Sequence, residues 1–314
     1  MTRPGAKVLA ALLVLPAFCF AGGRDTKMET IQANLLGTVK HLSEDIGRRS
    51  HLDLRRLDRA AAFIEERFRL YGLEPKRQAF TYNGNTYYNI IAEVKGSGSV
   101  KDGLLVIGAH YDTVSGTPGA DDNASGVAGL LELARLVAAE PVDKTVRFAA
   151  FSLEEPPVFM TRHMGSYVYA ESLKKEGAQV YGMISLEMLG YFCDKAGCQF
   201  YPSSLFRLFY PDRGDFIAFV GDLSSRSFTK KLKKAFKSVS SFPVESLNSL
   251  SIIPGVDFSD HRNFWKFGYP ACMATDTAFY RNPNYHGPGD TADTLDYKRM
   301  AEFVEGLHRA LGRL

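Results

Sequence analysis

The sequence has little of what would mark a specialised class of protein. Its 314 residues include one tryptophan and four cysteines, and the formal charge at neutral pH is only +3. Such a charge gives no argument for nucleic acid or an acidic surface as a partner. There is no internal repeat, low-complexity tract or glycine-rich phosphate loop. The composition is that of an ordinary globular protein, long enough for one large domain or two small ones.

The apolar run near the start is too short for a permanent membrane anchor. Arg3 and Lys7 precede residues 8–20, an apolar run interrupted only by Pro16, and Ala21 comes before two glycines. A charged start, a short apolar core and a small-residue exit predict a secretory signal over residues 1–21. We therefore expect residues 22–314 to be exported, to the periplasm or the medium. A buried N-terminal helix and a lipid anchor on Cys19 are the alternatives.

Three cysteines lie beyond this leader, and their spacing lacks the paired short repeats of a cysteine-based zinc site. In an oxidising compartment Cys193 and Cys198 could close a small disulfide loop and leave Cys272 unpaired. Three free thiols packed as small apolar residues are an equal alternative, because sequence does not report bond geometry.

Two kinds of apolar pattern follow each other along the chain. Helical spacing at residues 31–46 and 54–70 predicts two N-terminal helices within residues 26–73. Short apolar runs then alternate with helical stretches over residues 76–314, which is typical of buried strands between helices. We expect one domain with a three-layer α/β/α fold around a mixed, largely parallel sheet. The expected strands are 88–94, 104–108, 146–151, 180–186, 216–220 and 271–274, and the expected helices are 125–139, 165–177, 226–239 and 298–311.

Polar side chains suited to metal binding stand at the ends of several expected strands. His110 and Asp112 are two apart, so they face the same way, and a carboxylate behind an imidazole fixes its tautomer. Asp121 and Asp122 precede a helix, where one carboxylate could bridge two cations. The composition of this segment leaves the choice between the two aspartates open.

Three further elements complete the set. Glu154 and Glu155 follow the next strand and point in different directions, so one could hold metal while the other handles protons. Glu187 ends another strand, and His286 lies in a loop past the last strand. Open parallel sheets build their sites at the carboxyl ends of strands. Imidazole and carboxylate ligands without thiolate suit zinc, and two zinc ions with a hydroxide balance the three ligand carboxylates.

Taken together, these residues resemble the di-zinc aminopeptidase family of secreted bacterial leucyl aminopeptidases. This family also includes glutamate carboxypeptidases, and glutaminyl cyclases are related to it. The resemblance runs from about residue 89 to residue 297. The motifs that carry it are His110-Tyr111-Asp112, the segment from Gly119 to Gly126, Glu154-Glu155, Glu187 and His286.

The resemblance implies a role for each of these residues. His110 and Glu187 would hold one zinc, Glu155 and His286 the other, and Asp122 would bridge both, making two zinc ions per chain. Glu154 would be the general base that acts on a metal-bridging hydroxide, and Asp112 the partner of His110. The family also implies a cis peptide bond after Asp122. The expected activity is that of an exopeptidase, most simply an aminopeptidase, with peptides as substrates.

The sequence departs from the family pattern at two places. Many members continue with a glycine-containing turn after the glutamate pair, whereas this chain has Pro156-Pro157, and Glu187 stands where the best-known aminopeptidases have aspartate. Substrate preference and the choice between amino and carboxy termini therefore stay open, as does the oligomeric state. A glutaminyl cyclase with one zinc and a catalytically silent binding module are the alternative functions.

The remaining polar and aromatic candidates are expected to play supporting roles. We interpret His163 and His261 as structural or rim residues, and Asp276 and Asp290 as residues that orient the loop near His286. The aromatic segment 193–213 is predicted to be an excursion from the sheet that borders the site, with its rings more often packing than touching substrate. Tyr280 and Tyr285 are candidates for contact with the reacting substrate.

Overall fold

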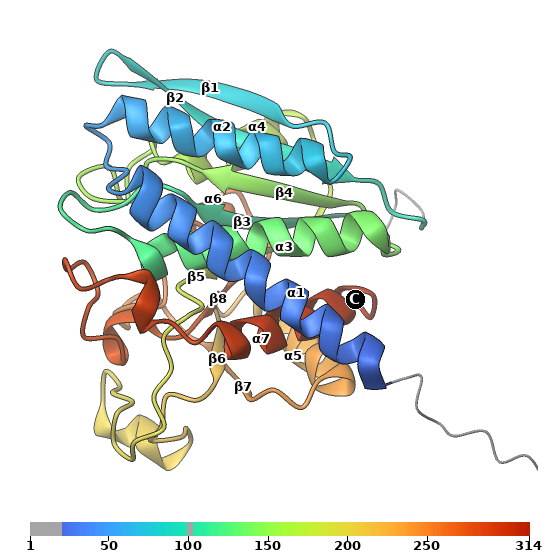
Figure 1. Ribbon diagram of the computed structural model, residues 1–314, viewed down its shortest axis with the longest axis vertical. Coiled ribbons are helices and arrows are strands. Elements are labelled where there is room, and N and C mark those ends of the chain that lie inside the picture. Colours follow the sequence, from blue (N-terminus) through green and yellow to red (C-terminus); the bar gives the residue numbers. More distant parts are fainter. Residues whose placement is uncertain (1–20, 99–102) are drawn as a thin grey trace, which may run out of the picture.

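A computed structural model describes residues 21–98 and 103–314 of the chain (Figure 1). Residues 1–20, which hold most of the predicted leader, lie outside the described residues. The elements follow in the order α1 (Ala21–Lys40), η1 (His41–Ile46), α2 (Leu54–Leu70), β1 (Lys76–Tyr82), β2 (Asn85–Val94), β3 (Leu104–His110), η3 (Ala120–Ser125), α3 (Gly126–Ala139), β4 (Val146–Phe151), α4 (Gly165–Lys175), β5 (Val180–Glu187), η4 (Ser204–Leu208), β6 (Ile217–Gly221), α5 (Arg226–Val239), β7 (Val244–Asn248), α6 (His261–Lys266), β8 (Ala271–Thr275), η5 (Ala278–Tyr280), η6 (Ala292–Thr294) and α7 (Tyr297–Leu311).

The eight strands form one mixed sheet in the order β1-β2-β4-β3-β5-β8-β6-β7. Strand β3 is parallel to β4 and to β5, and β5 is parallel to β8, so four neighbouring strands at the centre run in one direction. Strands β1 and β2 are added antiparallel at one edge, and β6 pairs antiparallel with β8 at the other. The four parallel strands therefore all end on the same side of the sheet, where their last residues lie next to one another.

Helices cover both faces of this sheet, because successive strand residues point to opposite sides. Leu105 and Ile107 of β3 join a core shared with α1, α2, α3, α5 and α7, whereas Val106 joins a second core shared with α4 and α6. In Figure 1, α1, α2, α3 and α7 lie on the near side of the sheet. The predicted three-layer α/β/α fold with a largely parallel centre is confirmed. No helix among the described residues is long and apolar enough to cross a membrane.

Local sequence accounts for the second N-terminal helix. In α2 the residues Leu57, Ala61, Ile64 and Phe68 recur at helical spacing and are all buried. The helix begins after Asp53, whose carboxylate accepts a hydrogen bond from the backbone N–H of Arg56. The first helix instead extends from Ala21 to Lys40 and continues into the π-helix η1. This segment packs against η3 and so brings the N-terminal region to the strand ends.

The sequence patterns find the central strands and miss the edges. Strands β4 and β5 and helices α5 and α7 lie within one residue of the expected bounds, but β1, β7 and the six-residue helix α6 were not predicted. The structure also decides between the two cysteine alternatives, because Cys193 and Cys198 form a disulfide while Cys272 is a free, buried thiol.

Candidate metal centre

The predicted ligands come from separate elements that meet where the parallel strands of the sheet end. His110 is the last residue of β3, Glu187 the last of β5, and Glu155 follows β4 by four residues. Asp122 lies in η3, and His286 lies in the loop that follows η5. Each central strand is nearly continuous in buried residues, so its register is fixed and its final side chain has a defined position.

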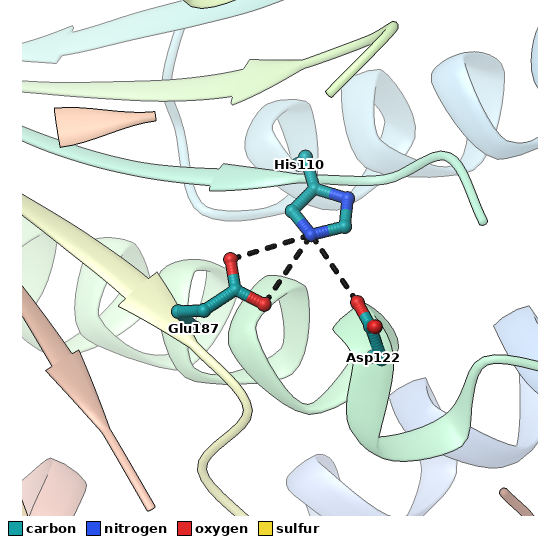
Figure 2. Close-up of side chains that lie close together, drawn as sticks. All are labelled: His110, Asp122 and Glu187. Carbon is teal, nitrogen blue, oxygen red and sulfur yellow. Dashed lines mark hydrogen bonds and ion pairs between the residues drawn. The ribbon is translucent and has the colours of Figure 1, made fainter. Parts of the chain in front are cut away.

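One group of ligands surrounds the His110 imidazole (Figure 2). Its Nε2 atom lies 3.4 Å from Asp122 Oδ1 and 3.3 Å from Glu187 Oε2. The three side chains point toward one another from β3, η3 and β5, and all three are buried. Their donor atoms lie within 4.8 Å of one another, which is the spacing that a shared cation needs.

A second group lies on the other side of Asp122. His286 Nε2 is 3.1 Å from Asp122 Oδ2 and 3.3 Å from Glu155 Oε2, and these atoms also lie within 4.8 Å of one another. The two oxygens of one carboxylate therefore face two different histidines. A side chain in this position can take part in two cation sites at once.

The neighbouring Asp121 is turned away from both histidines. Its carboxylate accepts hydrogen bonds from the backbone N–H of Gly190, at 2.9 Å, and from Asn282 Nδ2, at 2.8 Å. The Asp122–Asn123 peptide bond is cis, as the family resemblance implied. Composition left the two aspartates equivalent, and the fold turns Asp122, the one that the family resemblance implied, toward the cluster.

Asp112 connects three parts of the cluster. Its Oδ1 lies 3.5 Å from His110 Nδ1, and its two oxygens accept the backbone N–H groups of Glu154 and Glu155 at 3.1 Å each. His110 Nδ1 also donates to the Asp112 backbone carbonyl, at 3.2 Å, so Asp112 orients the His110 ring through its main chain and side chain, and its carboxylate holds the turn that carries both glutamates. Glu154 is buried, and its Oε2 lies 3.9 Å from His110 Nε2.

The charges in the cluster are out of balance. Asp122, Glu154, Glu155 and Glu187 are buried, and no lysine or arginine of the described residues forms an ion pair with any of them. Burial and the Asp122 carboxylate raise the pKa of Glu155 to about 8. Burial also raises the pKa of Glu154 well above its ordinary value. Buried carboxylates in this number call for cations, so the donor set fits divalent metal.

The sequence did not single out Ser259 as part of this site. Its hydroxyl donates to Glu187 Oε2 at 2.7 Å and lies 2.9 Å from the Ser185 hydroxyl. Asn123 Nδ2 donates to the Leu186 carbonyl, which fixes the end of β5 next to η3. Both residues orient ligands without joining the donor groups, and a serine in a loop carries no pattern by which sequence could have identified it.

The supporting residues occupy places that agree with their expected roles. Asp290 accepts the backbone N–H groups of Asp121 and Asp122, and Asp276 accepts those of Tyr191 and Ala278. His163 lies against the Tyr82 ring, with centroids 5.3 Å apart. His261 is buried and bonds the Val256 carbonyl. None of these four side chains belongs to the ligand groups found among the described residues.

A largely apolar cavity of about 100 Å³ adjoins Glu187. Segment 193–213 forms one wall of this cavity, so the segment borders the candidate site. Tyr285 also lines the cavity and stacks on His286, with ring centroids 3.8 Å apart, whereas the Tyr280 hydroxyl donates to the Pro254 carbonyl. The apolar and aromatic lining residues are Tyr201, Pro202, Phe206, Tyr210, Phe216, Ala218, Val220, Leu247, Ile253, Pro254, Val256, Phe258, Met273, Ala278, Phe279, Tyr280 and Tyr285.

This chain matches a known family and several known proteins. Residues 89–311 match the model of Peptidase family M28. An uncharacterized Escherichia coli protein, YfbL, is 45% identical over 278 residues, which cover 86% of this chain and 84% of that protein. A probable leucine aminopeptidase of Arthroderma otae is 28% identical over 232 residues, 69% of this chain and 54% of that protein. The chain thus spans about half the length of this leucine aminopeptidase.

Solved structures share the fold at lower identity. BSAP, a zinc aminopeptidase from Bacillus subtilis, has a TM-score of 0.69 at 17% identity, covering 89% of this chain and 94% of that one. The Bacteroides thetaiotaomicron glutaminyl cyclase has a TM-score of 0.68 at 18% identity, covering 90% and 98%. The family match, which includes every predicted ligand, and the YfbL relationship place the sequence: this chain belongs to peptidase family M28.

Proposed function

We propose that this chain is a zinc-dependent exopeptidase, most simply an aminopeptidase, with two zinc ions per chain. The observation that carries the proposal is the Asp122 carboxylate, whose two oxygens face His110 and His286 separately. His110 and Glu187 would complete one site, and Glu155 and His286 the other. The names of the relatives, a probable leucine aminopeptidase and a zinc aminopeptidase, agree with this assignment.

In the proposed reaction, bound zinc supplies Lewis-acid polarisation of the scissile carbonyl and makes water more acidic. Glu154 takes the proton from the attacking water and passes it to the leaving amine. Its carboxylate suits this role because it is buried beside His110 and lies in a third donor group, with His110 and Glu155, next to both proposed sites. Asp112 keeps Glu154 in place through the backbone, and it holds the His110 ring in one orientation.

The cavity beside Glu187 supports a preference for a large apolar terminal side chain. Its lining is mostly aromatic and aliphatic, and it opens next to a proposed metal ligand. Burial of an apolar side chain there would contribute about 25 cal/mol per Å² of surface removed from water. We therefore propose that peptides beginning with leucine or an aromatic residue are better substrates than those beginning with glycine or a charged residue.

A glutaminyl cyclase is the second candidate, favoured by the fold shared with the Bacteroides enzyme. That reaction needs one zinc and uses no water as nucleophile. The second donor group, His286 with Glu155 and Asp122, argues for the hydrolase, because it supplies the donors for a second metal ion beside those around His110.

A mixed peptide library read by mass spectrometry tests the proposed activity. Peptides with free amino termini should lose one residue at a time, and the same peptides with acetylated amino termini should stay intact. Loss of residues from the carboxy terminus would overturn the aminopeptidase assignment. Conversion of amino-terminal glutamine to a product lighter by ammonia would identify the cyclase.

Export through a cleaved leader is part of the proposal. The disulfide between Cys193 and Cys198 supports an oxidising compartment, where such bonds form and persist. Mass spectrometry of the protein recovered from its native compartment should give an amino terminus near Gly22. A protein that keeps Met1 in the cytoplasm would contradict export.

A further inference from the structure

Arg49 is a fully buried arginine that forms no ion pair among the described residues. Its guanidinium donates instead to backbone carbonyls of separate segments. Burying a charged group is costly unless its donors are satisfied, and here all three nitrogens have partners. The partners are the carbonyls of Leu42, Gly47, Tyr111, Pro118 and Gly119.

Three of these carbonyls belong to the loop that joins two proposed ligands. Nε donates to the Tyr111 carbonyl at 2.8 Å, directly after His110. Nη1 and Nη2 donate to the carbonyls of Pro118 and Gly119 at 3.0 and 2.9 Å, just ahead of η3 and Asp122. One planar guanidinium therefore holds both ends of the loop 111–119 and sets the separation of the strand end from η3.

The backbone of Arg49 strengthens the same connection. Its N–H donates to Thr113 Oγ1 at 3.0 Å, and its carbonyl accepts the N–H of Thr113 at 3.3 Å. Thr113 follows Asp112, which orients His110 and the glutamate pair. Two links, one through the side chain and one through the main chain, thus attach residue 49 to the loop.

Gly119 has the conformation and the space that this contact requires. Its φ of +65° lies in the left-handed region, and an added Cβ would clash with Thr113 Cγ2 and lie 3.0 Å from Arg49 Nη2. The glycine lets the loop backbone approach the guanidinium closely. The other two carbonyls, of Leu42 and Gly47, attach the guanidinium to η1 and the turn after it.

We propose that Arg49 is a positioning residue for the metal centre, one that lies outside the residues matched by the family model, 89–311. The inference rests on the proposed function. Arg49 acts through the loop 111–119 and fixes where His110 and Asp122 stand relative to each other, while η1 provides its anchor in the N-terminal region. A metal site whose ligands are less well oriented binds more weakly, typically by about 10- to 100-fold.

The test is titration of metal-free protein with cobalt(II), followed by its visible absorption, which reports the number and geometry of ligands. Arg49→Met removes the donors, and Arg49→Lys keeps the charge without the planar fork. Phe303→Leu in α7 is the control, because Phe303 is buried against Phe236 and Phe242 and touches none of the ligands. Thermal unfolding of the metal-free proteins measures the stability of each variant, so that variants of equal stability can be compared.

Both Arg49 variants should bind cobalt about 10- to 100-fold more weakly than the wild type and with an altered spectrum. Phe303→Leu should lose stability and keep the wild-type spectrum and affinity. Should Arg49→Met fail to fold, Arg49→Lys carries the test. Wild-type affinity and spectrum in a folded Arg49 variant, or full rescue by lysine, would overturn the inference. A wild-type protein that binds no cobalt would instead overturn the proposed function itself.

Discussion

At the scale of single residues, the candidate site contains adjacent residues of the same type that make different contacts. Asp121 and Asp122 are adjacent, yet one binds Gly190 and Asn282 while the other faces both histidines. Glu154 and Glu155 share a turn held by Asp112, but only Glu155 lies beside His286. Adjacent residues of like chemistry therefore provide matched pairs for mutation.

The glutamate pair separates proton transfer from metal binding. Glu154→Gln should leave the metal content unchanged and lower kcat by about 10²- to 10⁴-fold, because the amide cannot accept the proton. Glu155→Gln should instead weaken metal binding, since an amide oxygen is a poorer ligand than a carboxylate. Metal analysis beside steady-state kinetics measures both. Near-normal turnover in Glu154→Gln would exclude its role as base.

Ser259 offers a test of a residue that orients a ligand. Ser259→Ala removes the hydrogen bond to Glu187 Oε2 and should weaken zinc binding by about 10-fold. Ser166→Ala is the matched control, because Ser166 is also buried but bonds Asn263 instead of a ligand. Competition with a fluorescent zinc chelator gives both affinities. Equal affinities would show that the Ser259 hydrogen bond has no bearing on the metal.

At the scale of elements, sequence patterns predict the centre of the fold better than its edges. Central strands such as β3 are buried on both faces and appear as continuous apolar runs. The edge strands β1 and β7 are half exposed, so Lys76–Tyr82 and Val244–Asn248 mix polar and apolar residues and give no such run. Helix α6 has only six residues, too few for a helical period to be recognised.

The same reasoning explains which parts of the site were predictable. Ligands at strand ends, such as His110 and Glu187, follow a recognisable apolar run. The apolar cavity draws residues from between Glu187 and Tyr285 that share no period, and only the fold brings them together. Arg49 was likewise not recognisable from sequence, because it follows Arg48 after a helix, and arginines in such a place are usually exposed.

Segment 193–213 should set substrate preference, because Phe206 lines the cavity and packs against the rings of Tyr201 and Tyr210, which also contact each other. Phe206→Ala should lower kcat/KM for peptides that begin with a large apolar residue by about 10-fold and barely change it for alanine. Phe209→Ala is the control, because Phe209 is 74% exposed and does not line the cavity. An equal loss on both substrates in Phe206→Ala would contradict a role in selection.

At the scale of the whole molecule, no short stretch of the chain contains the site. Its predicted ligands run from His110 to His286, all eight strands belong to one sheet, and α1 packs against both α3 and α7. We propose on these grounds that residues 22–314 form a single domain. Loss of any long segment should then abolish metal binding and folding together.

His261 should make the whole molecule less stable in mild acid. Burial lowers its pKa to about 4, whereas the unfolded chain has the ordinary value of about 6.5. Between these values the unfolded state binds the extra proton, so the free energy of unfolding falls as pH drops, by at most about 3 kcal/mol from this group. Urea unfolding at pH 7 and pH 4.5 should show a smaller difference in His261→Gln. An equal difference would assign the acid sensitivity to other groups.

The count of zinc ions per chain tests the central claim most directly. Elemental analysis of zinc-saturated, dialysed protein should give two ions per wild-type chain and two for Asp121→Asn, whose side chain faces away from the histidines. Asp122→Ala should lose both ions, because its carboxylate faces His110 and His286 together. One ion in the wild type, or two ions retained without Asp122, would contradict a centre built on a shared carboxylate.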